Sequence, residues 1–237
     1  MLDSYSDEKS MIQEFTCDEL FGPLNDVEKR HSPKCLYLVG DKSIFDINPR
    51  VSVVGSRKAS AMGIKRAAKI SRILVESGAV VVSGLAEGID KTAHETAIEC
   101  GGRTIAVLGT PLDKEYPKSN ATLQRIIMQE HCAVSQYPVG YPTLPKNFIL
   151  RNRTMALISC ASIIVEASDT SGALSQGWET LRLGRLLFIS ESLFGQSNLK
   201  WPQEMLKYGA QVLSEENLES FLDYLPSGKI ADYALAF

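Results

Sequence analysis

The sequence lacks the features that mark a secreted, membrane-spanning or zinc-binding protein. Its five cysteines (Cys17, Cys35, Cys100, Cys132 and Cys160) are odd in number, scattered, and form no C-x-x-C pair. This usage predicts free thiols in a reducing cytoplasm and argues against a disulfide framework or a bound metal. No apolar run approaches the roughly 20 residues of a membrane span. The acidic N-terminal stretch MLDSYSDEKSMIQEF has no apolar signal core. We therefore expect a cytoplasmic protein without a membrane anchor.

Charge is unevenly distributed along the 237 residues, although the net charge is only −3. Residues 1–49 carry 10 acidic and 5 basic side chains, and residues 208–237 carry 5 and 1. The central residues 50–207 carry 13 acidic and 19 basic side chains, a net charge of +6. A basic centre between acidic ends permits a polyanionic partner, but a mixed solvated surface explains the charges equally well.

From residue 51 onward, short apolar runs alternate with amphipathic segments of helical period. The predicted strands are 51–55, 79–84, 103–109, 132–136, 162–167, 185–190 and 211–214, and the predicted helices are 61–76, 91–100, 119–130, 171–184, 202–208 and 215–224. Several strands are apolar throughout, as strands covered on both faces must be. The alternation predicts an α/β fold: an extended Rossmann-like, doubly wound and mostly parallel sheet with helices on both faces.

Two regions depart from the alternation. Residues 1–49 contain one predicted strand, 35–39, and we expect a small, partly flexible N-terminal appendage to a core of residues 50–237 that ends in an acidic helix. The segment PVGYPTLPKN, 138–147, holds three prolines, which predicts an irregular loop over the strand ends.

The first predicted turn of the core reads VVGSRKAS, 53–60. A dinucleotide-binding turn would carry two further glycines. Here only Gly55 is present, followed by Ser56, Arg57 and Lys58. Backbone N–H groups near a helix start, together with the Arg57 fork, suit an anion. The alternative is an ordinary turn with a capping Ser56 and a solvated Arg57.

The later turns differ in how strongly they indicate a site. In VVSGLAEGIDKTAHETA, 81–97, Gly84 and Gly88 permit a close ligand approach, whereas Asp90 and His94 are better explained by capping and packing than by catalysis. The stretch 108–120 is predicted to be an ordered structural loop. At 166–185, Ser171 and Gly172 open a helix that suits an anion, and Glu179 follows two turns later.

The segment KNFILRNRTMALISCASIIVEA, 146–167, is the most informative. It places one aromatic residue among several polar and cationic ones: Lys146, Phe148, Arg151, Asn152 and Arg153. A helical pattern from Leu150 sets the arginines at a helix start, the unfavourable end for cations unless an anion binds there. An aromatic ring among cations is typical of single-stranded nucleic-acid sites. Burial of one arginine in a structural role is an alternative that we also expect in part.

Seven motifs occur in an order that resembles the DNA-processing protein A family (DprA, or Smf). They are VVGSRKASAMG, VVSGLAEGIDKTAH, TIAVLGTPLDKEYPKSN, SQYPVG, NFILRNRTMALIS, VEASDTSGAL and LGR. The resemblance covers about residues 22–195. The resemblance implies a protein that binds single-stranded DNA and loads a RecA-type recombinase. It also implies a homodimer formed through the Rossmann domain, without a cofactor or catalysis.

The family motifs place the DNA-binding site at the G-S-R turn and at the basic–aromatic segment. The sequence departs from them in having Glu87 where the family usually has arginine, and Gln136 where it usually has glutamate. Only about 40 residues follow residue 195, so we expect no C-terminal winged-helix domain.

Two other functions remain open from the residues. The fold superfamily that the resemblance implies also includes nucleotide phosphoribohydrolases of the LOG group. If the protein were such an enzyme, Glu179 and Arg151 would stabilise a ribosyl transition state. The P-G-G-x-G motif of that group is missing here. A nucleotide-binding sensor would use the same pocket without hydrolysis.

Overall fold

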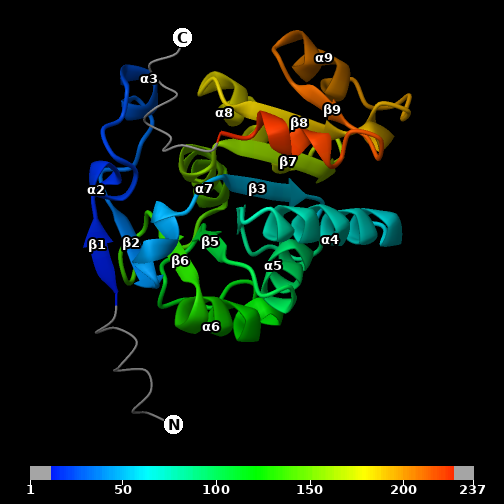
Figure 1. Cartoon of the computed structure of the whole chain (residues 1–237). Coiled ribbons are helices and arrows are strands. Elements are labelled where there is room, and N and C mark those ends of the chain that lie inside the picture. The colour runs from blue at the N-terminus through cyan, green and yellow to red at the C-terminus, as the bar shows by residue number, and fades with distance from the viewer. Residues whose placement is uncertain (1–11, 227–237) are drawn as a thin grey trace.

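The computed structural model describes residues 12–226, which form one nine-stranded sheet with helices on both faces (Figure 1). The strands are β1 (Gln13–Phe15), β2 (Leu36–Gly40), β3 (Arg50–Gly55), β4 (Val80–Ser83), β5 (Thr104–Leu108), β6 (Cys132–Ser135), β7 (Ala161–Glu166), β8 (Leu186–Ser190) and β9 (Gln211–Leu213). Their order across the sheet is β1-β2-β6-β5-β4-β3-β7-β8-β9. Every neighbouring pair is parallel except β1–β2 and β2–β6. The predicted fold class is confirmed.

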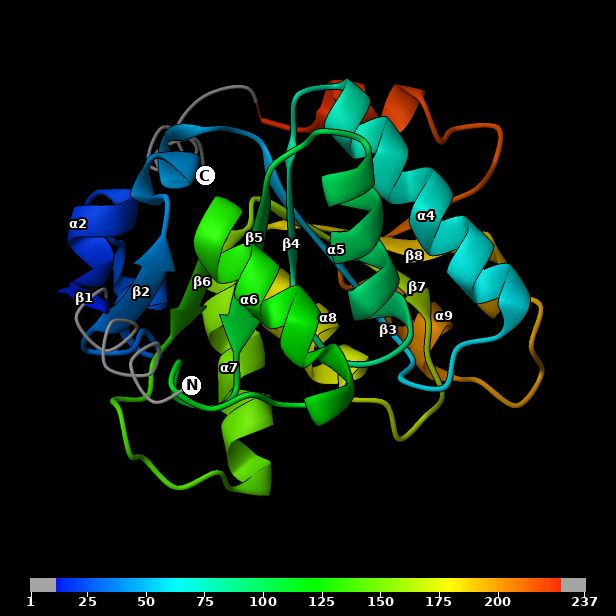
Figure 2. The same ribbon diagram turned by 90° about the horizontal axis from the view of Figure 1, so that it is seen from below.

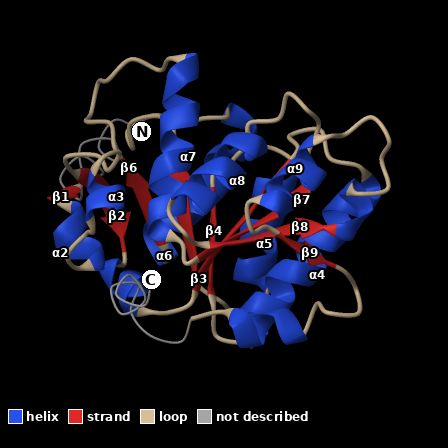
Figure 3. Cartoon of the chain, turned by 90° about the horizontal axis from the view of Figure 1, so that it is seen from above, coloured by secondary structure: helices blue, strands red, loops and turns tan. Residues whose placement is uncertain are grey.

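The principal helices cover the two faces of this sheet. They are α2 (Cys17–Phe21), α3 (Asp26–Lys29), α4 (Ala61–Glu76), α5 (Ile89–Glu99), α6 (Ala121–Glu130), α7 (Pro145–Ile158), α8 (Ala173–Arg182) and α9 (Trp201–Lys207). Helices α4, α5 and α6 lie on one face (Figure 2), and α7, α8 and α9 lie on the other (Figure 3). Val51 and Val53 of β3 pack with α4 and α5, whereas Val54 packs with α7 and α8. Burial on both faces explains why the strand is apolar throughout.

Residues 12–46 are joined to the sheet by strand pairing. Strand β2 pairs with β6 in the register Leu38↔Val134. Glu28 of α3 forms an ion pair of 2.7 Å with Arg185, at the start of β8, and both side chains are almost fully buried. The N-terminal segment therefore shares the main core, while the division at residues 49 and 50 stays a prediction.

The structure corrects two of the predicted helices. Helix α7 begins at Pro145, because proline is well suited to a first helical position. The acidic helix expected at 215–224 is instead a loop followed by a 3₁₀ helix, η4 (Ser220–Tyr224). Asn217 causes the difference, since its side chain accepts from the Ser214 N–H and donates to the Val212 carbonyl. Local bonds of this kind compete with helix formation.

The chain reverses its direction of travel across the sheet at β3. Strands β4, β5 and β6 follow on one side of β3, and β7, β8 and β9 follow on the other. Ligands in such sheets bind beyond the carboxyl ends of the strands near this reversal. Among residues 12–226, no helix is long and apolar enough to cross a bilayer.

Candidate nucleic-acid interface

A pocket opens at the carboxyl ends of β3, β4 and β5, beside the first turns of α7. It is lined by Arg57, Gly84, Ala86, Glu87, Leu108, Gly109, Thr110, Tyr116, Pro117, Phe148 and Arg151. Three successive βα turns thus contribute to one concave surface. The position agrees with the general rule for doubly wound sheets.

Two aromatic rings, from α7 and the loop after β5, lie in the pocket beside a cation from the turn after β3. The centroids of Tyr116 and Phe148 lie 5.2 Å apart with an interplanar angle of 39°. The Arg57 guanidinium carbon lies 5.7 Å from the Phe148 centroid, within cation–π range. Phe148 rests against Gly109, where an added Cβ would lie 2.6 Å from the ring. The exposed Tyr116 and half-buried Phe148 offer aromatic surface for a stacked base.

The turn after β3 is held by main-chain contacts. Ser56 donates its N–H to the Glu166 carbonyl (2.7 Å), and its own carbonyl accepts from the Ile89 N–H (3.2 Å). Gly88 has a φ of 75° and lies so close to the turn that a Cβ there would be 2.3 Å from the Ser56 carbonyl oxygen. The turn therefore holds Arg57 and Lys58 with both side chains exposed.

The N-terminus of α4 is capped by the protein's own groups. Ser60, rather than Ser56, is the capping residue, and its hydroxyl accepts from the Gly63 N–H at 3.0 Å. The Glu166 carboxylate accepts from the Ser60 N–H (2.9 Å) and hydroxyl (2.5 Å). A helix N-terminus at this place in a Rossmann fold commonly holds a nucleotide phosphate. Here a carboxylate already occupies it, which argues against a nucleotide bound in the usual way.

Arg151 forms the floor of the pocket and is only 6% exposed. Its guanidinium donates to the carbonyls of Gly84 and Val107, at the ends of β4 and β5. A Cβ on Gly84 would lie 2.0 Å from this guanidinium. Burial lowers the pKa of Arg151, and the nearby Asp90 carboxyl opposes that shift. Arg151 is thus the structural arginine expected among the α7 cations.

Asp90 and His94 are both buried and have separate partners. Asp90 accepts from the Gly84 and Ala86 N–H groups, and burial raises its pKa. His94 Nδ1 lies 2.7 Å from the Thr104 hydroxyl. That hydroxyl donates to the Val81 carbonyl, so Nδ1 carries the proton and donates. Burial lowers the pKa of His94 to about 3. The expected packing of His94 is confirmed. The expected capping by Asp90 is wrong, because the N-cap of α5 is Gly88 without a side-chain bond, and the Asp90 carboxylate holds the preceding loop instead.

Comparison with known proteins settles the family. The model of the family described as DNA recombination-mediator protein A matches residues 16–225. The chain belongs to this family. The resemblance inferred from the motifs is therefore confirmed.

Relatives of the recombination-mediator family support the same assignment. The chain is 41% identical to DNA processing protein DprA of Streptococcus pneumoniae over 157 residues, which cover 66% of this chain and 55% of that protein. It is 34% identical to Protein Smf of Escherichia coli over 183 residues, 75% of this chain and 49% of that protein. The chain spans about half the length of these two relatives.

Two solved structures of the family share the fold. The X-ray structure of S. pneumoniae DprA superposes with a TM-score of 0.76 at 32% identity, covering 92% of this chain and 77% of that one. DNA processing protein A of Helicobacter pylori superposes with a TM-score of 0.75 at 27% identity, covering 91% and 96%. The latter structure was described for its single-stranded DNA binding mode.

The pocket is lined by some of the site residues predicted from the sequence, and other predicted residues lie outside it. Arg57, Gly84, Phe148 and Arg151 line it. The other predicted contacts lie outside the lining: Gly55, Ser56, Lys58, Lys146, Asn152, Arg153, Ser171 and Gly172. Their DNA-binding role stays a prediction.

Several of the residues outside the lining have internal partners. Asn152 donates to the Gly172 carbonyl at 2.9 Å and accepts from Arg151, which ties α7 to the start of α8. The Ser171 hydroxyl accepts from the Ala173 N–H. By contrast, Lys146 is exposed and Arg153 is half-buried.

The residues of the phosphoribohydrolase alternative are not assembled into a site. Glu179 is buried and its carboxylate pairs with Arg182 at 2.5 Å. The Arg151 guanidinium is bonded to main-chain carbonyls and to Asn152 instead. Together with the family assignment, this arrangement disfavours the glycosidase reading.

The sequence predicts a structural loop around Tyr116, yet this ring lines the pocket and contacts Phe148. A place in the ligand site could have been predicted for Tyr116, because its loop follows the carboxyl end of a predicted strand. Glu87 also lines the pocket, and its carboxylate accepts from the Ser119 hydroxyl at 2.6 Å.

Proposed function

We propose that the protein binds single-stranded DNA and acts as a recombination mediator. The observation that carries this proposal is the grouping of Arg57, Tyr116 and Phe148 around one pocket at the strand ends. Stacking rings beside a cation suit a base and its phosphate, largely irrespective of sequence. Family membership and the H. pylori structure support the same ligand.

In this proposal the pocket binds a base, and the exposed cations bind the neighbouring phosphates. Arg57 binds a phosphate next to the stacked base, because its guanidinium reaches the pocket from a fixed turn. Lys58, Lys146 and Arg153 contact phosphates of the flanking nucleotides. Arg151 acts indirectly, by holding the ends of β4 and β5 in place. A duplex binds less well because its bases are already stacked and paired.

The proposal is tested by titrating a fluorescent single-stranded oligonucleotide at several salt concentrations. Phe148→Ala should weaken binding by roughly 1–3 kcal/mol, the usual loss for one stacked base. Arg57→Ala should weaken binding and reduce the salt slope by about 0.7, the value for one phosphate contact. Arg72→Ala, an exposed arginine in the last turns of α4, is the control. Unchanged affinity in both pocket variants would show that this is not the DNA site.

We propose that this binding is not accompanied by catalysis. The pairing of Glu179 with Arg182 supports this view, since it removes the carboxylate that a glycosidase would need. Incubating the protein with nucleoside monophosphates and assaying free base by chromatography is the test. Release of base that depends on Glu179 would contradict the proposal.

We further propose a cytoplasmic homodimer that hands DNA to a RecA-type recombinase. The support is membership of the DNA recombination-mediator protein A family. Light scattering after gel filtration gives the oligomeric state. A strand-exchange assay with purified recombinase and a single-strand-binding competitor tests mediation, and no acceleration would argue against it.

A further inference from the structure

Glu87 is the one acidic side chain that residues 12–226 contribute to the pocket lining. Its Oε1 accepts from the Ser119 hydroxyl at 2.6 Å, which orients the carboxylate. Its loop is fixed on two sides: Gly88 abuts the Ser56–Arg57 turn, and Asn120 donates to the Leu85 carbonyl at 3.0 Å. The buried Leu85 is held at a φ of 58°, a conformation that persists only in a well-supported loop.

The neighbours of Glu87 make its position unusual for a site that binds a polyanion. Arg57 is on the adjoining turn, and the Tyr116–Phe148 ring pair lines the same pocket. A phosphate would be attracted to Arg57 and repelled by Glu87. A base stacked on the two rings would direct its edge toward the side of the pocket that carries Glu87. The carboxylate therefore faces a base edge if the strand binds with its phosphate on Arg57.

We propose that Glu87 recognises the Watson–Crick edge of guanine, so that the pocket prefers this base. A carboxylate can only accept hydrogen bonds, and it offers two oxygens side by side. Guanine presents two adjacent donors, N1–H and the N2 amino group. Adenine, cytosine and thymine each place an acceptor next to their donor on this edge, where it would oppose a carboxylate oxygen. Only guanine satisfies both oxygens.

This inference rests on the proposed single-stranded DNA binding and makes it more specific. The strand would be held sequence-independently by Arg57 and the rings, with one position read by Glu87. A bidentate base contact discriminates against the wrong base by about 1–3 kcal/mol, which corresponds to roughly a 5- to 150-fold preference at 25 °C. Because Glu87 is exposed, the lower end of that range is expected.

The test compares oligothymidylates that carry one central guanine, adenine or cytosine with the unsubstituted strand. The wild-type protein should bind the guanine strand about tenfold more tightly, and Glu87→Ala should reduce that ratio to near one. Inosine, which lacks the N2 amino group, should retain part of the preference, and 7-deazaguanine should retain all of it. Glu115→Gln, a carboxylate of the neighbouring loop that pairs with Arg125, should leave the ratio unchanged.

Two outcomes would overturn the inference while leaving the proposed function intact. One is Arg57-dependent binding with equal affinity for all four strands. The other is a Glu87→Ala variant that binds every strand more tightly by the same factor, which would make Glu87 a phosphate-repelling residue only. Failure to bind any single strand would overturn the proposed function as well.

Discussion

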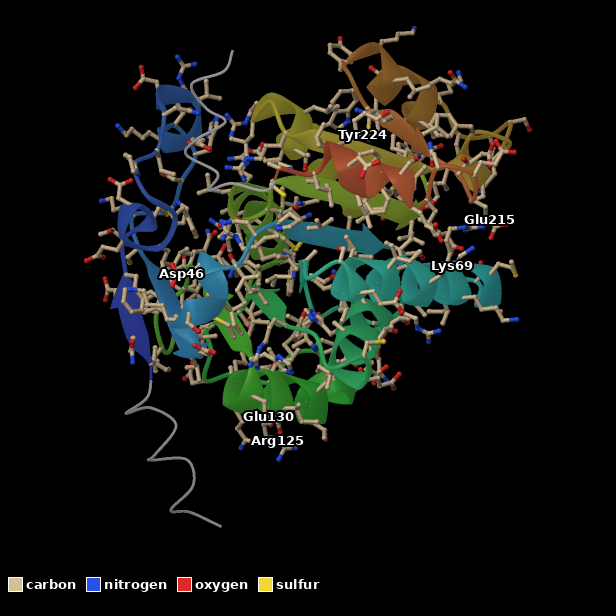
Figure 4. All side chains as sticks on the ribbon, in the orientation of Figure 1. Asp46, Lys69, Arg125, Glu130, Glu215 and Tyr224 are labelled. Atoms are coloured by element: carbon tan, nitrogen blue, oxygen red, sulfur yellow. The ribbon has the colours of Figure 1, made fainter. Side chains whose placement is uncertain are left out.

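The Glu166 carboxylate, at the end of β7, accepts hydrogen bonds from both the backbone N–H and the hydroxyl of Ser60, at the start of α4. This contact spans the point where the chain reverses direction across the sheet. It anchors the turn that carries Arg57, and it places a negative charge where the helix dipole is positive. Surface charges elsewhere are linked more loosely, as in the exposed Lys69–Glu215 pair (Figure 4).

Replacing Glu166 should destabilise the start of α4. Glu166→Gln keeps the side-chain shape but removes the charge and puts a donor where the Ser60 groups need acceptors. We expect a loss of about 1–2 kcal/mol in the free energy of unfolding, measured by urea denaturation. Glu215→Gln is the control, because an exposed ion pair contributes little. Equal stability of the two variants would contradict the capping role.

The two arginines Arg151 and Arg153 should respond differently to substitution. Arg151→Met leaves the buried carbonyls of Gly84 and Val107 without their donor, and we expect a loss of about 2–4 kcal/mol in the free energy of unfolding. Arg153→Ala should cost less, about 1 kcal/mol or below, because Arg153 is only half-buried, and it should lower DNA affinity. Urea denaturation and titration with a single-stranded oligonucleotide, each on both variants, test this difference between the two arginines. A stable Arg151→Met protein would refute the structural role.

A methyl group at position 84 should deform the floor of the pocket. In Gly84→Ala the new Cβ would lie 2.0 Å from the Arg151 guanidinium, which is itself held by two carbonyls. We expect a loss of about 1–3 kcal/mol in stability, as for other overpacked sites, together with weaker DNA binding. Gly195→Ala, where nothing lies within 4 Å of the new Cβ, is the matched control. The prediction fails if the two variants unfold at the same urea concentration.

The buried His94 should make stability fall as the solution is acidified. Its pKa is lowered to about 3 in the folded protein by burial, against an ordinary value of about 6.5 in the unfolded chain. Below about pH 6.5 only the unfolded state takes up this proton, so the free energy of unfolding decreases by up to about 1.4 kcal/mol per pH unit. Burial also lowers the pKa of His131, which adds to the effect.

Urea denaturation between pH 7 and pH 4.5 measures this slope. His94→Gln should reduce this slope, because the variant lacks the side chain whose pKa burial lowers in the folded state. An identical slope in wild type and His94→Gln would show that other groups cause the acid sensitivity.

The secondary structure of the core followed from local patterns in the sequence. Apolar runs such as VSVVG and AVVVSG predicted the buried parallel strands, because a strand with both faces covered has no polar side. The same patterns failed at 215–224, where Asn217 bonds to Ser214 and Val212 and ends the helical pattern. Lys58 and Phe148 were also nominated from the sequence, but only the structure separates the side chain that lines the pocket from the one that does not.

The net charge of residues 50–207 overstates the number of cations that are free to bind a polyanion. Three of the arginines in the basic centre, Arg50, Arg151 and Arg185, are buried and donate to main-chain carbonyls. They are unavailable to a polyanion, although they contribute to the net charge of +6.

The sequence by itself determined the fold class, the family and the residue types of the site, because helical and strand periods and turn motifs are encoded by neighbouring residues. Tertiary structure alone decided which side chains share the pocket. Arg151 meets a carbonyl 67 residues away, and Glu166 meets a serine 106 residues away. Such contacts depend on the strand order and on the free-energy cost of leaving buried polar groups unpaired. Neither can be predicted from one short segment of the sequence.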